Sequence, residues 1–336
     1  MSMLSSVYPA ESPDHMRRRK IVKKGFQLCL MVCGRTGTGK STFVNTLCDG
    51  KIFSDSERQV AVHEDGITRD MQIRTHKVDL CEEDGTVIAL TVVDTPGFGD
   101  NIDNSKCCGT ILNYLETQFD EVLAEESRVH RNPRFDDKRV QVCLYFIAAT
   151  GHGLRELDID LMSTLSRRVN IIPVIAKADT FTDEELIINK TKILADIEHY
   201  KIPIFSFNYA EDETDQEVID ECVALRALLP FAVVGSDDIY EVDSQFVRGR
   251  SYPWGFVSTE DPEFSDFSYL RTVIFGSHLQ ELRDLTHDVI YEKYRSDKLS
   301  ANASLIPPRI NDNRSYNDSI QETGSLGRSM GRMAMF

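Results

Sequence analysis

The residues from Gly34 to Thr42, GRTGTGKST, have the types and spacing of a phosphate-binding loop. Glycines at 34, 37 and 39 permit backbone conformations closed to other residues, so successive N–H groups can turn toward an anion. Lys40 supplies positive charge for β- and γ-phosphates, and Ser41 offers a hydroxyl to Mg²⁺. An apolar run precedes the loop and helical spacing follows it. This context favours a nucleotide site over a glycine-rich turn with a chance Lys-Ser.

Asp94-Thr95-Pro96-Gly97 has the chemistry of a second element of the same site. It ends the apolar run 87–93, which predicts a buried strand. A carboxylate there can hold Mg²⁺ through water, and the Gly97 N–H can approach a γ-phosphate. A DTPG sequence alone indicates only a turn. Because it follows a predicted strand, 60 positions after Gly34, it strengthens the prediction of a nucleotide site.

A base-reading element follows the apolar run 169–175. Asp179 can accept both the ring N–H and the exocyclic amine of guanine, while the Lys177 stem packs on the ring. Because Lys177 and Asp179 follow the phosphate-binding loop and the Asp94–Gly97 segment in this order along the chain, they favour guanine as the base. Gly235 ends the run 231–234, where a backbone N–H can meet a base carbonyl, and Arg250 can stack on a purine. Trp254, the only tryptophan, belongs either to a hairpin anchor or to an interface.

The elements that must position these groups alternate along the chain. Apolar strands are expected at 26–32, 87–93, 140–149, 169–175 and 231–234, and helices after the loop and at 113–126, 157–165 and 183–200. This alternation predicts an α/β fold of the P-loop NTPase type, with a mostly parallel sheet flanked by helices. Apolar residues recur at three and four over 266–295 and predict one long amphipathic helix. We expect mobile tails at 1–14 and 299–336, a basic arm at 15–25, and one domain at 26–298.

Composition narrows the choice of partners. The 336-residue chain has 38 Lys plus Arg against 54 Asp plus Glu, a net charge of −16, which argues against nucleic acid as a partner. Its eight cysteines form no C-x-x-C pair and are expected to be reduced. We find no 18-residue apolar stretch and no leader pattern, so we expect an intracellular protein.

Two charged segments stand out. The basic arm holds six cations, Arg17, Arg18, Arg19, Lys20, Lys23 and Lys24. It is either solvated or a patch for anionic lipid or an acidic partner surface. The stretch 211–221 holds seven carboxylates and is either a solvated helix face or the counterpart of such an arm in another copy.

With these motifs in hand, the chain resembles the septins, a GTP-binding, filament-forming family, and most of all its fungal members. The likeness covers roughly 16–298 and rests on GRTGTGKST, DTPGFGD, ESRVHRNPRF, ATGHGL, AKAD and RGRSYPWG. It implies a G-domain whose GTP or GDP, with Mg²⁺, is buried between two subunits. A second, opposite interface would use the basic arm, which resembles the septin phosphoinositide-binding segment, and the long helix. Two such faces on one subunit give an open chain, hence filaments of several septins at the cell cortex, division site or septum.

Carried over by position, the resemblance assigns a set of nucleotide contacts. His152, otherwise a loop histidine between glycines, becomes with Thr180 and Glu185 a residue that reaches the neighbouring subunit's nucleotide. Ser41 and Asp94 are the expected metal ligands. The nucleotide-contacting set is Gly34, Thr36, Gly37, Thr38, Gly39, Lys40, Ser41, Thr42, Asp94, Gly97, Lys177, Asp179, Gly235, Arg250, His152, Thr180 and Glu185.

Two features depart from the family pattern. Hydrolysing septins have a threonine where this chain has Asp70, with Thr68 two residues away; a carboxylate would repel the γ-phosphate. Most septins outside one group also continue past the long helix into a coiled coil, which we do not expect in residues 299–336. We therefore expect a septin subunit with a structural nucleotide and little or no hydrolysis. The alternatives are a GTPase cycling as a switch, and a pocket retained only for interface packing.

Overall fold

The structure is a computed structural model that describes residues 26–53, 73–81, 87–99, 105–133, 135–209, 215–242 and 244–304. The chain divides into two compact units, Met1–Arg295 and Ser296–Phe336. The first unit contains the sheets and nearly all helices. Of the second, the structure describes the last helical residues of α10 (Glu292–Ser304).

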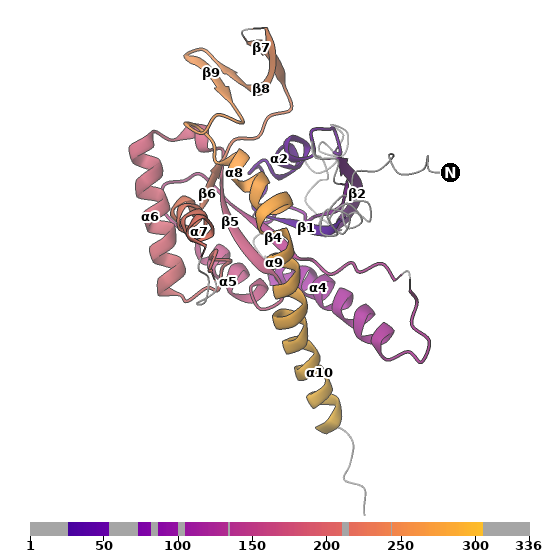
Figure 1. Ribbon diagram of the computed structural model, residues 1–336. Coiled ribbons are helices and arrows are strands. Elements are labelled where there is room, and N and C mark those ends of the chain that lie inside the picture. The colour runs from indigo at the N-terminus through magenta and orange to yellow at the C-terminus, as the bar shows by residue number, and fades with distance from the viewer. Residues whose placement is uncertain are drawn as a thin grey trace, which may run out of the picture. The chain divides into compact units, whose positions relative to one another are not determined.

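A six-stranded sheet in the order β2-β3-β1-β4-β5-β6 forms the centre of the first unit (Figure 1). Five strands run parallel, and β2 pairs antiparallel with β3 at the edge. Parallel strands place their carboxyl ends at one edge, so the loops after β1, β3, β5 and β6 meet there. The strands are β1 (Phe26–Gly34), β2 (Arg74–Cys81), β3 (Val87–Asp94), β4 (Val142–Ile147), β5 (Asn170–Ala176) and β6 (Phe231–Val233).

Helices cover both faces of this sheet, as the α/β prediction required. One face packs against α4 (Ser105–Glu126), α5 (Glu156–Leu165) and α6 (Asp183–His199). The other packs against α2 (Lys40–Leu47), α7 (Gln216–Leu228), α8 (Phe267–Thr272) and α9 (Leu279–Asp284). A three-stranded antiparallel sheet, β7 (Ile239–Val242), β8 (Gln245–Tyr252) and β9 (Gly255–Ser258), stands beyond the strand ends (Figure 1).

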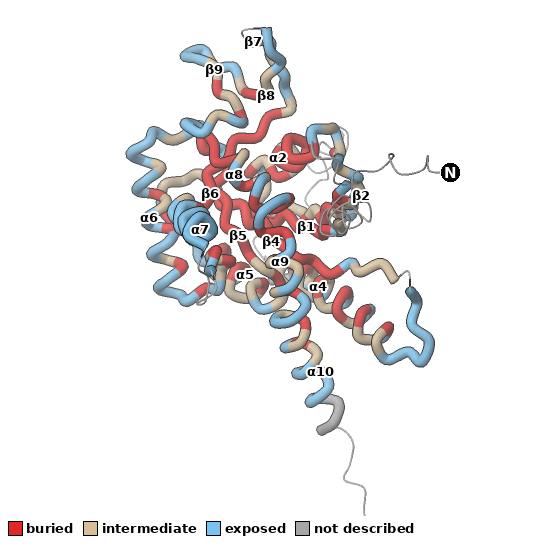
Figure 2. The backbone as a smooth tube through the Cα atoms, viewed as in Figure 1, coloured by how far each residue is buried: buried red, intermediate tan, exposed pale blue. Residues whose placement is uncertain are grey.

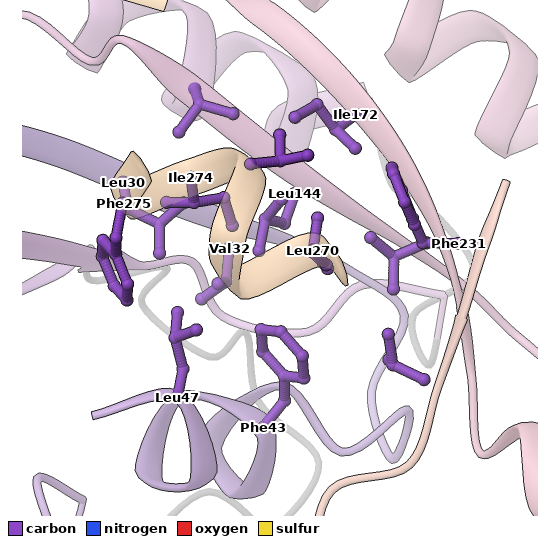
Figure 3. Packing of buried hydrophobic residues seen from close by; sticks show 14 of the residues in the cluster. Leu30, Val32, Phe43, Leu47, Leu144, Ile172, Phe231, Leu270, Ile274 and Phe275 are labelled. Atoms are coloured by element: carbon purple, nitrogen blue, oxygen red, sulfur yellow. The ribbon is translucent and has the colours of Figure 1, made fainter. Parts of the chain in front are cut away.

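The alternation of β1 side chains explains why the strand is apolar throughout. Leu30 and Val32 face the α2 side, where Phe43 and Leu47 pack with the α8 residue Leu270 (Figure 3). Cys29, Met31 and Cys33 face the α4 side. Both faces are covered, so the central strands are buried while the outer sides of α6 and α7 are exposed (Figure 2).

The predicted long C-terminal helix is interrupted. After α8 the chain passes through a π-helical segment, η2 (Val273–Ser277), then α9, a second π segment, η3 (Leu285–Tyr291), and α10. At the second segment the Leu282 carbonyl accepts hydrogen bonds from Thr286 Oγ1 at 2.8 Å and Asn170 Nδ2 at 3.1 Å. Side-chain donors thus occupy a carbonyl of the helical ladder where the π turn begins, a recognised cause of local rewinding.

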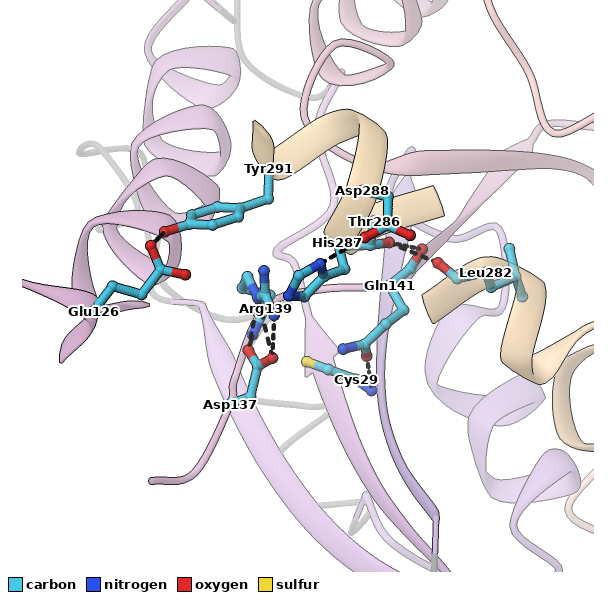
Figure 4. Close-up of polar contacts among 10 residues, drawn as sticks. All are labelled: Cys29, Glu126, Asp137, Arg139, Gln141, Leu282, Thr286, His287, Asp288 and Tyr291. Atoms are coloured by element: carbon cyan, nitrogen blue, oxygen red, sulfur yellow. Dashed lines mark hydrogen bonds and ion pairs between the residues drawn. The ribbon is translucent and has the colours of Figure 1, made fainter. Parts of the chain in front are cut away.

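Polar contacts join this helical run to the sheet and α4 (Figure 4). Tyr291 Oη donates to Glu126 at 2.8 Å, and the Arg139 guanidinium lies 4.7 Å from the Tyr291 ring centroid. Arg139 pairs in turn with Asp137. These contacts fix the end of η3 against α4.

Several boundaries differ from the sequence prediction. Helix α4 begins at Ser105 rather than 113, and β2 was not predicted because its alternating exposure lacks an apolar run. Helix α10 extends to Ser304, beyond the boundary expected at 298. The basic arm Arg17–Lys24, Thr68, Asp70 and the acidic residues 211–214 lie outside the described residues.

All eight cysteines are free thiols. Among the helices that the structure describes, none is both long and apolar enough to cross a membrane.

Candidate nucleotide site

The turn between β1 and α2 has the backbone of an anion-binding loop. Gly37 and Gly39 have φ values of 79° and 90°, in the left-handed region that other residues avoid. Gly39 is the N-cap of α2, so the helix's first N–H groups face the turn. Ser41 and Thr42 lie half-buried in its first turn, as the sequence placed them.

Lys40 is folded into the loop. Its side chain donates from Nζ to the carbonyls of Gly34 and Arg35, both at 2.9 Å, and the residue is only 7% exposed. Thr38 Oγ1 donates to the same Arg35 carbonyl at 2.8 Å. Carbonyls of the loop therefore hold the ammonium within the turn that is expected to bind phosphates.

The DTPG segment packs directly on this loop. Thr36 N donates to the Phe98 carbonyl at 3.1 Å, and a Cβ on Gly97 would lie 2.5 Å from Thr36 Cα. Only glycine fits that approach. Asp94 ends β3, and burial raises its pKa while the positive charge of Lys40 opposes the rise. Its Oδ1 is buried and lacks a hydrogen-bond partner within the described part of the chain.

The base-reading residues follow β5. The Asp179 side chain is fully buried, at 0% exposure, and receives Arg250 Nη1 at 3.0 Å on Oδ2. Tyr252 Oη donates to the same oxygen. Arg250 Nε also donates to the Gly235 carbonyl at 3.0 Å. The guanidinium thus lies on the carboxylate, where the sequence had suggested stacking on a base.

The loop and base elements adjoin each other. A Cβ on Gly39 would lie 4.0 Å from Lys177 Cε, and one on Gly235 would lie 3.1 Å from Phe43 Cα in α2. Ser236 and Thr46 exchange hydrogen bonds between the two elements, at 3.1 and 3.0 Å. The structure therefore brings together the loop, Asp94, Gly97, Lys177, Asp179, Gly235 and Arg250.

Three expected residues lie apart, on the surface. His152 is exposed in the loop after β4, and Thr180 Oγ1 donates to the Lys177 carbonyl at 2.8 Å. Glu185 forms a capping box with Thr182 at the start of α6, and this hydrogen bonding lowers its pKa. In a single copy of the chain these three residues do not join the cluster, and their contact with a neighbouring subunit's nucleotide stays a prediction.

Sequence reasoning missed Tyr252. It lies two residues after Arg250 on β8, and side chains two apart on a strand share a face. That period would have placed its phenol on the same face as Arg250 had β8 been recognised as a strand; the contact with Asp179 was not predictable from it.

The fold and these strand-end groups define a protein of the P-loop GTPase class. The family model described as Septin matches residues 24–307. The chain belongs to the septin family, and so is a GTP-binding, filament-forming septin subunit.

Individual relatives agree with this assignment. Cell division control protein 11 of Saccharomyces cerevisiae is 44% identical over 88% of this chain and 72% of its own length. Septin homolog spn3 of Schizosaccharomyces pombe is 46% identical over 87% and 78%. The crystal structure of Cdc11 from S. cerevisiae superposes with a TM-score of 0.55 at 34% identity, covering 81% of this chain and all (100%) of that one. The septin GTPase domain from Chlamydomonas reinhardtii gives 0.60 at 27% identity, covering 80% and 98%.

Proposed function

We propose that the chain binds GTP or GDP between the β1–α2 loop and Asp179, as a mainly structural ligand of a septin polymer. The observation that supports this most is the position of a fully buried carboxylate beside the loop, with Lys177 Cε within 4.0 Å of a Cβ position on Gly39. Guanine presents two adjacent donors to such a carboxylate, and adenine does not.

Mg²⁺ fits the same site. Asp94 Oδ1 is a buried acceptor with no partner among the described residues, and Ser41 lies in the first turn of α2. Hydroxyl and carboxylate oxygens are the ligands that Mg²⁺ prefers alongside phosphates. When bound, the ion would neutralise phosphate charge. Asp94 and Ser41 would orient the ion, and the glycines of the loop have no side chains to occupy the phosphate position.

Weak or absent hydrolysis is part of the proposal. It rests on Asp70, which the septin resemblance aligns with the threonine of hydrolysing septins, and an ionised carboxylate cannot donate a hydroxyl hydrogen bond. The competing function is a switch GTPase. Single-turnover hydrolysis separates them: a rate on the order of 1 s⁻¹ or faster favours the switch.

Assembly would use two opposite surfaces. His152, Thr180 and Glu185 are exposed and available to a neighbour's nucleotide, and the basic arm would meet another subunit or a phosphoinositide surface. We place the filament in the cytoplasm at the cell cortex or division site, in line with the name of the 44%-identical yeast relative. Charge reversal of Arg17–Lys20 should weaken binding to anionic vesicles; unchanged binding would remove the lipid role.

The nucleotide itself is tested by denaturing the purified protein and separating what it releases. We expect guanine nucleotide, close to one per chain, from the unmodified protein and none from Lys40→Ala, which lacks the loop ammonium. Binding of added GDP, measured by calorimetry, covers a protein purified without nucleotide. No guanine nucleotide in either measurement would reject the proposal.

A further inference from the structure

Asp179 makes its strongest contacts through one oxygen. Arg250 Nη1 lies 3.0 Å from Oδ2 but 3.4 Å from Oδ1, and the Tyr252 hydroxyl also donates to Oδ2. Two charge-assisted donors therefore share Oδ2, while Oδ1 has, within the described part of the chain, the long Arg250 contact alone.

A guanine base needs both oxygens, because its ring N–H and exocyclic amine donate side by side. Entry of the base into hydrogen-bond distance requires room at Oδ2. Of the two donors there, Arg250 also donates from Nε to the Gly235 carbonyl at 3.0 Å, so its guanidinium stays anchored when Nη1 moves off Oδ2. The Tyr252 hydroxyl has a single proton and donates it to Oδ2, so a base can take that position only if this bond is given up.

Tyr252 also connects Asp179 to the molecular surface. Its ring stacks on Trp254 with centroids 4.7 Å apart and planes 6° from parallel. Trp254 is 66% exposed. Both residues lie at the β8–β9 turn, so the phenol cannot leave Asp179 without disturbing this stack.

We propose that Tyr252 is a gate on the base-reading carboxylate: its hydroxyl competes with guanine for Asp179 Oδ2, and its stack on Trp254 couples that competition to the protein surface. This rests on the proposed function. The pKa of Tyr252, raised by burial and by the Asp179 hydrogen bond, keeps the phenol a proton donor at neutral pH. Contact of a neighbouring subunit with Trp254 would then change how readily the pocket accepts a nucleotide.

The experiment measures binding of a GDP carrying a fluorescent ribose label, by stopped flow, to the full chain. Tyr252→Phe keeps the ring and removes the hydroxyl, so we expect association about tenfold faster and a lower Kd. Tyr240→Phe is the matched control, because Tyr240 packs on Phe256 in the same small sheet and leaves Asp179 untouched. It should bind like the unmodified protein.

A second measurement needs no variant. Trp254 is the only tryptophan, so intrinsic emission reports the stack directly. We expect saturating unlabelled GDP to change this emission in the unmodified protein. No change at saturation, or Tyr252→Phe binding no faster than Tyr240→Phe, overturns the gate and leaves nucleotide binding intact. Absence of GDP binding to the unmodified protein and to both tyrosine variants instead rejects the proposed function.

Discussion

Gly97 brings two backbone segments closer than a side chain allows. A Cβ there would meet Thr36 Oγ1, Cα and N at 2.4, 2.5 and 2.7 Å. Gly97→Ala should therefore displace the phosphate-binding loop, destabilise the protein by about 1–3 kcal/mol and weaken GDP binding. Chemical denaturation and calorimetry measure the two effects.

The control is Gly109→Ala in α4. Nothing lies within 4 Å of its Cβ position, so the change should raise stability by about 0.5–1 kcal/mol and leave GDP binding alone. Equal behaviour of the two variants would show that the loop does not depend on the Gly97 approach.

His278 gives the stability a pH dependence. Its ring is buried, with Nδ1 2.8 Å from Ser277 Oγ, Nε2 3.9 Å from Glu281 Oε2, and Phe205 and Phe207 against its sides. Burial lowers its pKa from the ordinary 6.5, and Glu221 opposes the shift only partly. Below pH 6.5 the unfolded chain consequently binds more protons than the folded one, and stability falls.

We expect the free energy of unfolding to decrease from about pH 7.5 to about pH 5.5, with a smaller decrease in His278→Gln. Glu281, whose pKa burial raises, lies 3.9 Å from His278 and works in the opposite direction, so His278→Gln is also compared in a Glu281→Gln background. The free energies of unfolding are measured by urea denaturation at the two pH values. An equal decrease in the unmodified protein and in His278→Gln would contradict this role of His278.

At the scale of single residues, the motif positions were predictable and their contacts were not. Phosphate and guanine binding require particular residue types at particular spacings. The glycines, Lys40, Asp94 and Asp179 could therefore be recognised from the sequence. The Arg250 contact with Asp179 depends on how β8 packs against the β5 loop, and no local pattern specifies that. The sequence also could not predict that Lys40 donates to the Gly34 and Arg35 carbonyls.

Among the elements, η3 is held to α4 by a small aromatic cluster. Tyr291 is fully buried (0% exposed), its ring centroid lies 5.8 Å from that of Phe119, and Tyr294 lies 5.2 Å from Phe119. Tyr294 Oη donates to Asp120 at 2.7 Å. The cluster fixes where the C-terminal helical run leaves the sheet.

Tyr291→Ala should cost about 3–5 kcal/mol, since it removes the packed ring and the hydrogen bond to Glu126. Tyr291→Phe, which loses only that bond, should cost about 1.5 kcal/mol. Tyr269, 45% exposed on α8, is the control; its replacement by Ala should cost about 0.5 kcal/mol. If Tyr291→Ala matched Tyr269→Ala in urea denaturation, the cluster would not anchor the helix.

Elements buried on both sides were predictable because continuous apolar runs identify them. The strands at β1, β3, β4 and β5 follow such runs closely. Strand β2 alternates between exposed and half-buried residues at the sheet edge, where pairing with β3 rather than burial stabilises it. The second π segment, η3, depends on Thr286 and Asn170 donating to the Leu282 carbonyl, and the Asn170 bond joins residues 112 apart in the chain, which periodicity does not encode.

For the whole molecule, the order of the three nucleotide elements predicted both the fold and the family, because strand ends of a parallel sheet gather at one edge. Assembly involves contacts between copies, which a single chain does not contain. Exposed residues such as His152 and Trp254 indicate where those contacts would form. A nucleotide enclosed between copies would stabilise the polymer by mass action, so filament formation should respond to added GDP.

The central claim is that Asp179 reads guanine. Its replacement by Asn converts one acceptor into a donor, which matches xanthine, whose C2 bears a carbonyl where guanine has an amine. The decisive measurement is calorimetric titration of the unmodified chain and Asp179→Asn with GDP and XDP. We predict that Asp179→Asn loses GDP affinity on the order of 100-fold and gains XDP binding that the unmodified chain lacks. Equal GDP affinity in the two proteins would contradict the assignment of Asp179 and with it the proposed site.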